Sequence, residues 1–453
     1  MNTLRKLVLT IFINGLFGLL TLLPVSSQAQ DVKSNKLSTA HPTESGLEEI
    51  TVTARRRVEN VQDVPIPVSV LGGEFIADSG SFNVNRLKEL VPTLQFYSSN
   101  PRNSSVNIRG LGSPFGLIND GIEPGVGFYI DGVFNARPAV ATLDFLDVAQ
   151  IEVLRGPQGT LYGKNTTAGA INITTLRPSS SPEEAAEISF GAYGFLQGKA
   201  SINGPLSSRV SGRIAFSGTR RDGLLFNVTD QGNLNNLNNL GVRGQLLYSL
   251  SEDLDILFAT DLTRQRPEGY AQLPVGVTPT LRAANRQYAG IAADLGYAPP
   301  SFNAFDRATD ADTAHKSNQD VGGVALTADW SVGSGKLTSI SAWRFWEWDP
   351  SSDRDFLGLP ITTVSANPSR QSQLSQEIRY AGDLLPSLNF VVGAFAFKQV
   401  IDSTGKQEQG AAAARFGPET TGTMPVVPVS LNTQQTILSA RGLTLSWIVI
   451  TNH

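Results

Sequence analysis

The sequence predicts a mainly β protein, in which a small α+β domain is followed by antiparallel strands of a transmembrane β-barrel. Two observations support this fold class. After position 183, apolar and polar residues alternate over runs of about 9 to 13 residues, which is longer than most strands of soluble sheets. Strands of that length cross a bilayer when tilted, with one face in lipid and one in water. Residues 62–178, by contrast, combine short alternating runs with two segments of helical spacing.

The N-terminus indicates export. Arg5 and Lys6 precede a largely apolar stretch over 7–23, and small residues follow at 27–29. This pattern predicts a cleaved secretory signal peptide over 1–29. The apolar stretch is near spanning length, so an N-terminal membrane anchor is the alternative. The chain contains no cysteine, so an exported protein of this kind draws its stability from size, barrel closure or membrane embedding rather than disulfides.

Composition excludes several classes of function. A net charge of −4 leaves no excess of basic residues for nucleic-acid binding. The three histidines (His41, His315 and His453) are far apart, so no metal-ligand spacing exists and no metal site or cofactor is expected. No Ser/His/Asp set or pair of carboxylates stands out, and we expect the protein not to be an enzyme.

The leader over 30–61 is polar and is expected to be disordered, except for a short β-prone run at 48–54 that reads EEITVTA. Such a run can add itself as a strand to the sheet edge of another protein. The alternative is that it forms the ordinary first strand of the domain that follows.

The small domain is organised around residues 148–175. Two alternating runs, 148–154 and 170–175, predict a strand–turn–strand unit. Their connector carries glycines, which indicate positive φ angles or close packing, at Gly156, Gly159, Gly163 and Gly169. Upstream segments predict two helices and two strands, at 72–79, 83–90, 106–111 and 127–133. Asp131 and Gly132 between apolar runs predict a hairpin or bulge.

The glycine-rich connector is not a nucleotide-binding loop. A Walker A loop needs Gly-Lys followed by Ser or Thr, whose hydroxyl holds Mg²⁺. Here Gly163 and Lys164 are followed by Asn165, and Gln158 stands where the first glycine should be. The connector therefore reads as a structural unit.

The strands of the second part are expected at nine places: 185–193, 195–204, 209–221, 240–250, 253–264, 319–332, 336–348, 371–382 and 388–400. Short turns alternate with long loops between them, as in outer-membrane barrels. Three tryptophans near one strand end suggest an interfacial aromatic girdle, namely Trp343, Trp346 and Trp348. The alternative is a large soluble β-sandwich with one solvent-exposed face.

The motifs together resemble those of the TonB-dependent outer-membrane receptors. The run at 48–54 looks like a TonB box. The runs QDVPIPVSV, VNIRGL, VGFYIDGV and IEVLRGPQGTLYGKNTTAGAINITT look like successive motifs of the family's plug domain, and they stand at 62–70, 106–111, 126–133 and 151–175. The run QLSQEIRYAGD at 373–383 is similar to a barrel strand of the same family.

The resemblance implies a plug, over 62–178, seated in a 22-stranded barrel that begins at 183. It implies an outer-membrane monomer surrounded by lipid, and energised uptake of a bulky small-molecule ligand such as a ferric siderophore, with iron present only in the transported complex. A periplasmic TonB protein would pair with Glu49, Ile50, Thr51, Val52, Thr53 and Ala54. Structural roles in the plug would fall on Arg109, Gly110, Asp131, Gly132, Glu152, Arg155 and the four connector glycines. Those glycines would let plug loops pack against the barrel wall, and Arg109 and Arg155 would be buried beside Glu152 and Asp131.

The barrel departs from this pattern in length. About 270 residues follow position 183, enough for eight or nine of 22 strands. Residues 183–400 then form only the first part of a barrel, and residues 401–453 are expected to be a loop and an irregular end. We therefore expect a prematurely ended chain, because an open sheet edge in lipid leaves backbone groups unpaired.

The leading function is transport, in a complete or truncated form. The alternative is a non-transporting remnant, or a ligand-sensing or interaction protein, that retains the plug and the TonB box. A passive porin is disfavoured because the plug and the TonB box have no role in one.

Overall fold

The computed structural model describes residues 50–113, 122–385, 388–416 and 432–451. They belong to one compact unit, Ile50–His453. The expected signal peptide, most of the leader and Glu49 lie outside the described residues.

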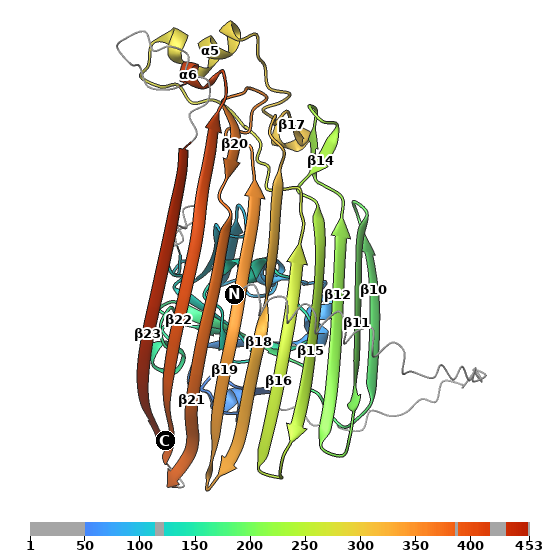
Figure 1. Cartoon of the computed structure of the whole chain (residues 1–453), viewed down its shortest axis with the longest axis vertical. Helices are drawn as coiled ribbons and strands as arrows, with labels where there is room; N and C mark the ends of the chain where they lie inside the picture. Colours follow the sequence, from blue (N-terminus) through green and yellow to red (C-terminus); the bar gives the residue numbers. More distant parts are fainter. Residues whose placement is uncertain (1–49, 114–121, 386–387, 417–431, 452–453) are drawn as a thin grey trace, which may run out of the picture. The chain divides into compact units, whose positions relative to one another are not determined.

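A large antiparallel sheet dominates this unit (Figure 1). Consecutive long strands are neighbours throughout the sheet. The strands are β10 (Glu183–Gly191), β11 (Phe195–Pro205), β12 (Val210–Arg221), β15 (Leu237–Ser249), β16 (Leu254–Gln265), β18 (Lys316–Val332), β19 (Gly335–Ser351), β21 (Ser369–Leu385), β22 (Leu388–Gln409) and β23 (Asn432–Thr451). A short strand, β20 (Thr362–Ala366), pairs with the far end of β22. Within the described residues the edge strands β10 and β23 do not pair with each other, so the sheet is not closed.

All nine expected strands are present, and the fold class is confirmed. The end of the chain differs from the expectation of a loop and an irregular end over 401–453. Strand β22 continues to Gln409, and β23 pairs with it along 20 positions from Gln407↔Asn432 to Leu388↔Thr451. The sequence of β23 lacks clear alternation of apolar and polar residues, so its side-chain pattern does not predict a strand. Backbone pairing with the long neighbouring strand β22 accounts for the strand instead.

The plug domain is built on a second, five-stranded sheet in the order β3-β8-β9-β6-β7. Its strands are β3 (Val68–Gly72), β6 (Val126–Ile130), β7 (Val133–Phe134), β8 (Val148–Arg155) and β9 (Gly169–Thr175). The expected strand–turn–strand unit is the antiparallel pair β8–β9, with the short helix α4 (Gly159–Tyr162) in its connector. Two helices, α2 (Gly73–Asp78) and α3 (Val84–Leu90), and the hairpin β4–β5 (Leu94–Ser98 and Ser104–Ile108) complete the domain.

The plug packs against one face of the large sheet. Its core is formed by apolar side chains such as Leu87, Ile151 and Ile171, and the sheet residues Val321, Trp346 and Trp348 belong to the same cluster. Trp346 and Trp348 are therefore buried, and the predicted aromatic girdle of three tryptophans is wrong for these two. Because side chains alternate along β19, only Trp343 of the three points to the other face.

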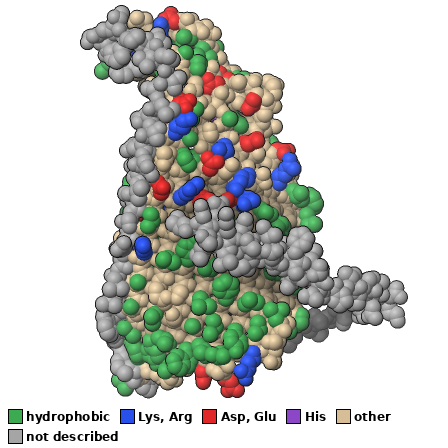
Figure 2. Space-filling model, in the orientation of Figure 1, with side chains coloured by type: hydrophobic (Ala, Val, Ile, Leu, Met, Phe, Trp, Pro, Cys, Tyr) green, Lys and Arg blue, Asp and Glu red, His purple; other side chains and the backbone are tan. Residues whose placement is uncertain are grey.

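The face turned away from the plug carries a band of exposed apolar side chains. Its exposed side chains include Phe216, Leu246, Phe258, Leu326, Leu374 and Ile378. In Figure 2 hydrophobic side chains gather over the lower part of this face, and charged side chains lie mostly above them and again at the lower rim. Among the described residues, no helix is long and apolar enough to cross a membrane.

The two rims of the sheet have different connectors. Short turns join β11 to β12, β15 to β16 and β18 to β19 at one rim. At the opposite rim the chain makes long excursions, including the small sheet β14-β13-β17 (Gly232–Leu234, Leu225–Asn227 and Ala308–Thr309) and helix α5 (Tyr288–Asp294). In outer-membrane barrels short turns face the periplasm and long loops face outward.

Candidate functional site

The first described segment, residues 50–57, is docked on the plug. Strand β1 (Thr51–Val52) pairs antiparallel with β2 (Glu59–Asn60). Val52 and Ala54 are 1% and 0% exposed, and they pack in a cluster with Tyr129, Leu154 and Tyr162. Ile50 is 51% exposed. We call residues 50–54 the coupling segment. The expectation of a disordered leader over 30–61 is wrong for this part, because two small apolar side chains fit a pocket in the plug core.

A buried carboxylate holds the coupling segment. Glu152 on β8 is fully buried, and its Oε1 accepts hydrogen bonds from Thr53 N at 2.7 Å and Thr53 Oγ1 at 3.0 Å. Gln150 Nε2 donates to the same oxygen at 2.7 Å, and Asn172 Nδ2 donates to Thr53 Oγ1 at 3.0 Å. Hydrogen bonds to a charged group contribute about 1.5–3 kcal/mol each, so this contact fixes the segment strongly.

Arg56 follows the coupling segment and connects it to the large sheet. Its guanidinium lies 4.1 Å from the ring centroid of Tyr162 and 5.1 Å from that of Tyr129, and it faces Glu377 of β21 at 3.7 Å. Burial alone would lower the pKa of Arg56, but Glu377, the two tyrosines and Glu152 together outweigh burial and raise the pKa above its usual value. Arg56 is therefore a fixed cation that contacts the plug and the sheet together.

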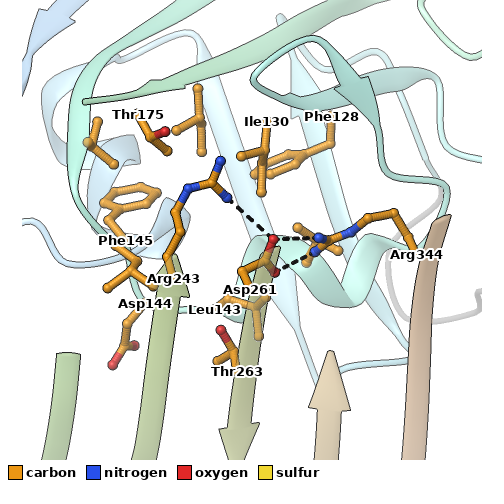
Figure 3. Close-up of a pocket in the computed structure, with 14 residues that line it drawn as sticks. Phe128, Ile130, Leu143, Asp144, Phe145, Thr175, Arg243, Asp261, Thr263 and Arg344 are labelled. Carbon is orange, nitrogen blue, oxygen red and sulfur yellow. Dashed lines mark hydrogen bonds and ion pairs between the residues drawn. The ribbon is translucent and has the colours of Figure 1, made fainter. Parts of the chain in front are cut away.

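An ion network joins the plug to the large sheet, and Figure 3 shows its sheet members Arg243, Asp261 and Arg344. Asp131, in the β6–β7 hairpin, pairs with Arg243 of β15 and accepts from Thr175 N at 2.8 Å. Arg243 reaches Asp261 of β16 at 3.3 Å, and Arg344 of β19 holds Asp261 through two hydrogen bonds of 2.5 and 2.8 Å. We call these four residues the plug–sheet ion network. Breaking such a buried network on one side leaves an uncompensated charge.

The hairpin that carries Asp131 also touches the sheet directly. A Cβ added at Gly132, which has φ +79°, would lie 2.9 Å from Ile340 Cδ1 on β19. Glycine therefore meets two demands here, a left-handed backbone and a close approach. The expected hairpin at Asp131 and Gly132 is present as the pairing Ile130↔Val133.

Two cavities border these contacts. One of about 60 Å³ lies beside the ion network among apolar side chains such as Phe128 and Leu143, with Asp144 at its edge. Burial raises the pKa of Asp144 to about 6, although hydrogen bonds from Thr219 and Asn239 oppose the shift. The other, of about 690 Å³, is lined by Thr53, Arg56 and Asp131. Both the coupling segment and the ion network therefore face one open space.

Neutral amide contacts hold the plug along another stretch, residues 134–142. Gln373 of β21 donates to Phe134 O at 2.6 Å and accepts from Ala136 N at 3.2 Å. Gln265 donates to Thr142 O at 3.1 Å, and Gln319 donates to Thr142 Oγ1 at 2.9 Å. Sequence reasoning did not identify these residues. The available signal was the recurrence of glutamine at alternate positions of barrel strands, on the face opposite the apolar one.

The two arginines expected to be buried differ from that expectation. Arg109 is exposed, in the turn Arg109–Gly110 where both residues have positive φ. Arg155 donates to the carbonyl oxygens of Pro67 and Val68 at 3.5 and 3.2 Å. Glu152 instead accepts hydrogen bonds from Thr53, and Asp131 pairs with Arg243. The pattern showed which residues were charged, but not which strand ends reach the surface of the plug.

Three of the connector glycines, Gly156, Gly163 and Gly169, have a conformational role through positive φ angles, rather than the expected packing against the barrel wall. Gly156, Gly159 and Gly163 have open space where a Cβ would stand. A Cβ at Gly169 would lie 2.3 Å from Leu154 O, which belongs to the plug itself. The close packing is therefore internal to the pair β8–β9.

A comparison with known families agrees with this geometry. The family model described as the TonB-dependent Receptor Plug Domain matches residues 60–170. The chain carries the plug domain of the TonB-dependent receptors. Members of this family are not enzymes. They are outer-membrane proteins, which agrees with the exposed apolar side chains on the outer face of the large sheet.

Among curated relatives of this receptor, the "Pesticin receptor" of Yersinia enterocolitica is 33% identical over 209 residues, which cover 45% of this chain and 26% of the relative. The "Catecholate siderophore receptor Fiu" of Escherichia coli is 24% identical over 161 residues, covering 35% and 20%. The matched region thus spans between a fifth and about a quarter of the length of these relatives.

Solved receptors share the fold. The ferric yersiniabactin uptake receptor FyuA from Yersinia pestis superposes with a TM-score of 0.63 at 21% identity, covering 76% of this chain and 50% of that one. The ferripyoverdine receptor of Pseudomonas aeruginosa superposes with a TM-score of 0.60 at 13% identity, covering 89% and 55%. The receptor described here therefore corresponds in fold to about half of each solved chain.

Proposed function

We propose that this receptor takes part in TonB-energised uptake of a bulky ligand across the outer membrane, and that the ligand is a ferric siderophore or a similar iron complex. The observation that carries the proposal is the docked coupling segment. A β-prone strand at the N-terminal edge of the plug is held by one buried carboxylate and lies next to the contacts between plug and sheet.

Pairing with TonB would use residues 49–54 as an added strand. Val52 and Ala54 are buried and Thr53 is bonded to Glu152, so the segment has to leave the plug before both of its edges are free. The exposed Ile50 offers a first point of contact. Pulling on the segment would then displace Arg56 from between Tyr129 and Tyr162 and disturb its contact with Glu377.

The proposed ligand class follows from the need for TonB-type energy, because that energy is needed for the uptake of complexes too large for passive pores. The relatives and solved structures named above are described as receptors for catecholate siderophores, ferric yersiniabactin, ferripyoverdine and pesticin. An iron complex is the class that most of them share, and the transported iron is cargo rather than a cofactor.

The test is uptake of radioactive iron by a Gram-negative strain that lacks its own siderophore receptors and produces the 453-residue chain. Catecholate, hydroxamate and phenolate complexes are supplied one at a time, with and without TonB. We expect uptake of one class that depends on TonB. The variant Val52→Pro removes an N–H from the strand that TonB would pair with, so uptake should fall to the level without TonB while ligand binding remains.

The matched control is Val58→Pro, because Val58 is 72% exposed and lies outside β1 and β2. Uptake in this variant should equal that of the parent chain. Equal uptake by the Val52→Pro variant, or uptake that does not require TonB, would contradict the proposal. Ligand binding without uptake in the parent chain would favour the ligand-sensing or interaction function.

A further inference from the structure

A buried carboxylate joins two loops at the rim with the long excursions. Asp353 lies in the loop between β19 and β20 and is 0% exposed. Its Oδ1 accepts from Asp355 N at 3.1 Å and from Phe356 N at 2.9 Å, within the same loop. Its Oδ2 accepts from Asp312 N at 3.2 Å, in the segment that leads from β17 to β18. One side chain therefore holds backbone N–H groups of two loops that are 41 positions apart.

Further hydrogen bonds join these two loops to each other and to a third. Thr313 Oγ1 donates to Thr363 O at 3.2 Å, which ties the segment before β18 to the start of β20. Gly410 N, which follows β22, donates to Ile361 O at 3.0 Å. We call the three segments the loop knot, namely 310–315, 352–361 and 410–412.

Like charges face one another in the loop knot. The charged groups closest to Asp353 are the carboxylates of Asp355 and Asp312, and Asp312 also faces Asp310. Among the described residues, no lysine or arginine contributes to the charge around Asp353 or Asp312. Asp310 Oδ1 is buried and has no hydrogen-bond partner in the described part of the chain. The bonds that hold the knot together therefore bring uncompensated negative charge together.

The other charged or titratable groups around the knot do not neutralise it. Arg354 follows Asp353 in the sequence, but its guanidinium donates to a side-chain amide of β22 at 2.7 Å. The Tyr297 hydroxyl is hydrogen-bonded to Asp310 and adds no positive charge. His315 faces Asp230 instead, and burial lowers its pKa.

These surroundings favour the neutral form of Asp353. Burial, Asp355 and Asp312 raise the pKa of Asp353 from the usual 3.8 to about 7, although the hydrogen bonds from backbone N–H groups oppose the shift. A protonated Asp353 still accepts hydrogen bonds from its own loop. An ionised Asp353 is a buried charge beside two further carboxylates, and it gains hydration when the loops separate.

We propose that the loop knot is an acid-strengthened clasp, which one proton on Asp353 holds closed and which loosens when that proton is lost. The geometry supports this device because the same carboxylate bonds both loops and carries the unfavourable charge. The clasp concerns the loops at this rim, and the inference requires neither TonB nor a transported ligand.

The direction of the pH effect follows from linkage. A carboxyl group whose pKa is higher in the closed clasp than in the open one stabilises the closed form below about pH 4. This stabilisation is lost as the pH rises through about 7. Most Asp353 carries a proton at about pH 6 and most has lost it at about pH 8, so the opening equilibrium constant should rise about tenfold between the two.

The test is amide hydrogen exchange of the 453-residue chain in detergent micelles, at about pH 6 and about pH 8. Mass spectrometry follows peptides that cover 310–315 and 352–362, which contain the three N–H groups bonded to Asp353. Protection factors are corrected for the intrinsic exchange rate at each pH, so they report the opening equilibrium. Asp353→Asn keeps an oxygen acceptor and does not titrate. The matched control is Asp349→Asn, because Asp349 lies at the same rim, is 61% exposed and pairs with Lys316.

We expect protection in these peptides to fall about tenfold from pH 6 to pH 8 in the parent chain and in Asp349→Asn, and to stay constant in Asp353→Asn. Equal protection at the two pH values in the parent chain would overturn the proposal, and this comparison needs no variant. A tenfold fall that persists in Asp353→Asn would overturn it too, because another group would then titrate. Peptides around the buried Ile151 and Ile171 of the plug check that the variant is folded. Iron uptake is not measured, so failure here leaves the proposed function untouched.

Discussion

Thr53 and Glu152 are ninety-nine positions apart, yet the backbone N–H and the hydroxyl of Thr53 both donate to one oxygen of Glu152, at 2.7 and 3.0 Å. The carboxylate is fully buried, and the residues on either side of Thr53, Val52 and Ala54, are buried with it. The segment that resembles a TonB box is therefore part of the plug core in this structure. Its availability to a partner depends on the free energy of releasing it.

The variant Glu152→Gln should make the coupling segment easier to release. It replaces hydrogen bonds to a charge by bonds to a neutral amide, and each charged bond is worth about 1.5–3 kcal/mol. The chain has no cysteine, so a single cysteine at Val52→Cys reports release by its rate of reaction with a maleimide. We expect a rate about ten- to a hundredfold higher in the Glu152→Gln background.

Two controls accompany this measurement. Glu123→Gln removes a carboxylate that is 42% exposed and pairs with Lys164 on the plug surface, and it should leave the labelling rate unchanged. A cysteine at the exposed Ile50 should react fast in every background. An unchanged rate at position 52 after Glu152→Gln would show that Glu152 does not hold the segment.

Removal of Arg243 should destabilise the docking of the plug on the sheet. Arg243→Met leaves Asp131 and Asp261 without one of their partners in a largely buried site, which costs about 3–5 kcal/mol. The measurement is the free energy of unfolding from urea titration, followed by tryptophan fluorescence in micelles. Arg209→Met, at an exposed turn, should change it little.

A second change tests whether the loss comes from stranded charge. Adding Asp131→Asn to Arg243→Met neutralises one of the carboxylates, so part of the lost stability should return. Additive effects of the two substitutions, with no recovery, would argue that Arg243 acts through packing instead of through the ion network.

Much of this fold was predictable because barrel strands carry a side-chain pattern of their own. The nine alternating segments all became strands, and the glycine-rich stretch at 148–175 became β8, α4 and β9. The strand β23 was missed because pairing with β22 creates it in the absence of alternation. The partners of Glu152 and Asp131 were missed for a different reason. These partners depend on which plug turn contacts which barrel strand. Such contacts join residues that are far apart in the sequence, so no local sequence pattern predicts them.

The stability of the plug–sheet contact should depend on pH through Asp144. Burial raises its pKa to about 6 from the usual 3.8, so the folded state binds a proton more readily than the unfolded state. The stabilisation is fully present below about pH 4 and is lost as the pH rises through about 6. The shift of about two units corresponds to about 3 kcal/mol at most. Unfolding temperature at a series of pH values measures it.

The variant Asp144→Asn isolates this contribution. It keeps an acceptor for Asn239 Nδ2, which donates to Asp144 at 3.0 Å, and does not titrate. The part of the pH dependence between about pH 4 and 6 that comes from Asp144 should therefore disappear. If parent and variant show the same pH profile, Asp144 has an ordinary pKa in the folded receptor.

The connector glycines offer a matched pair for separating backbone strain from packing. Gly163 and Gly159 both have open space where a Cβ would stand, but only Gly163 has a positive φ, of +78° with ψ −148°. That region is essentially restricted to glycine, and other residues there cost about 1–3 kcal/mol. Gly163→Ala should lower the free energy of unfolding by that amount. Gly159→Ala, at the start of α4, should leave it equal or raise it by up to about 1 kcal/mol. Equal losses in the two variants would mean that the connector needs glycine for close packing after all.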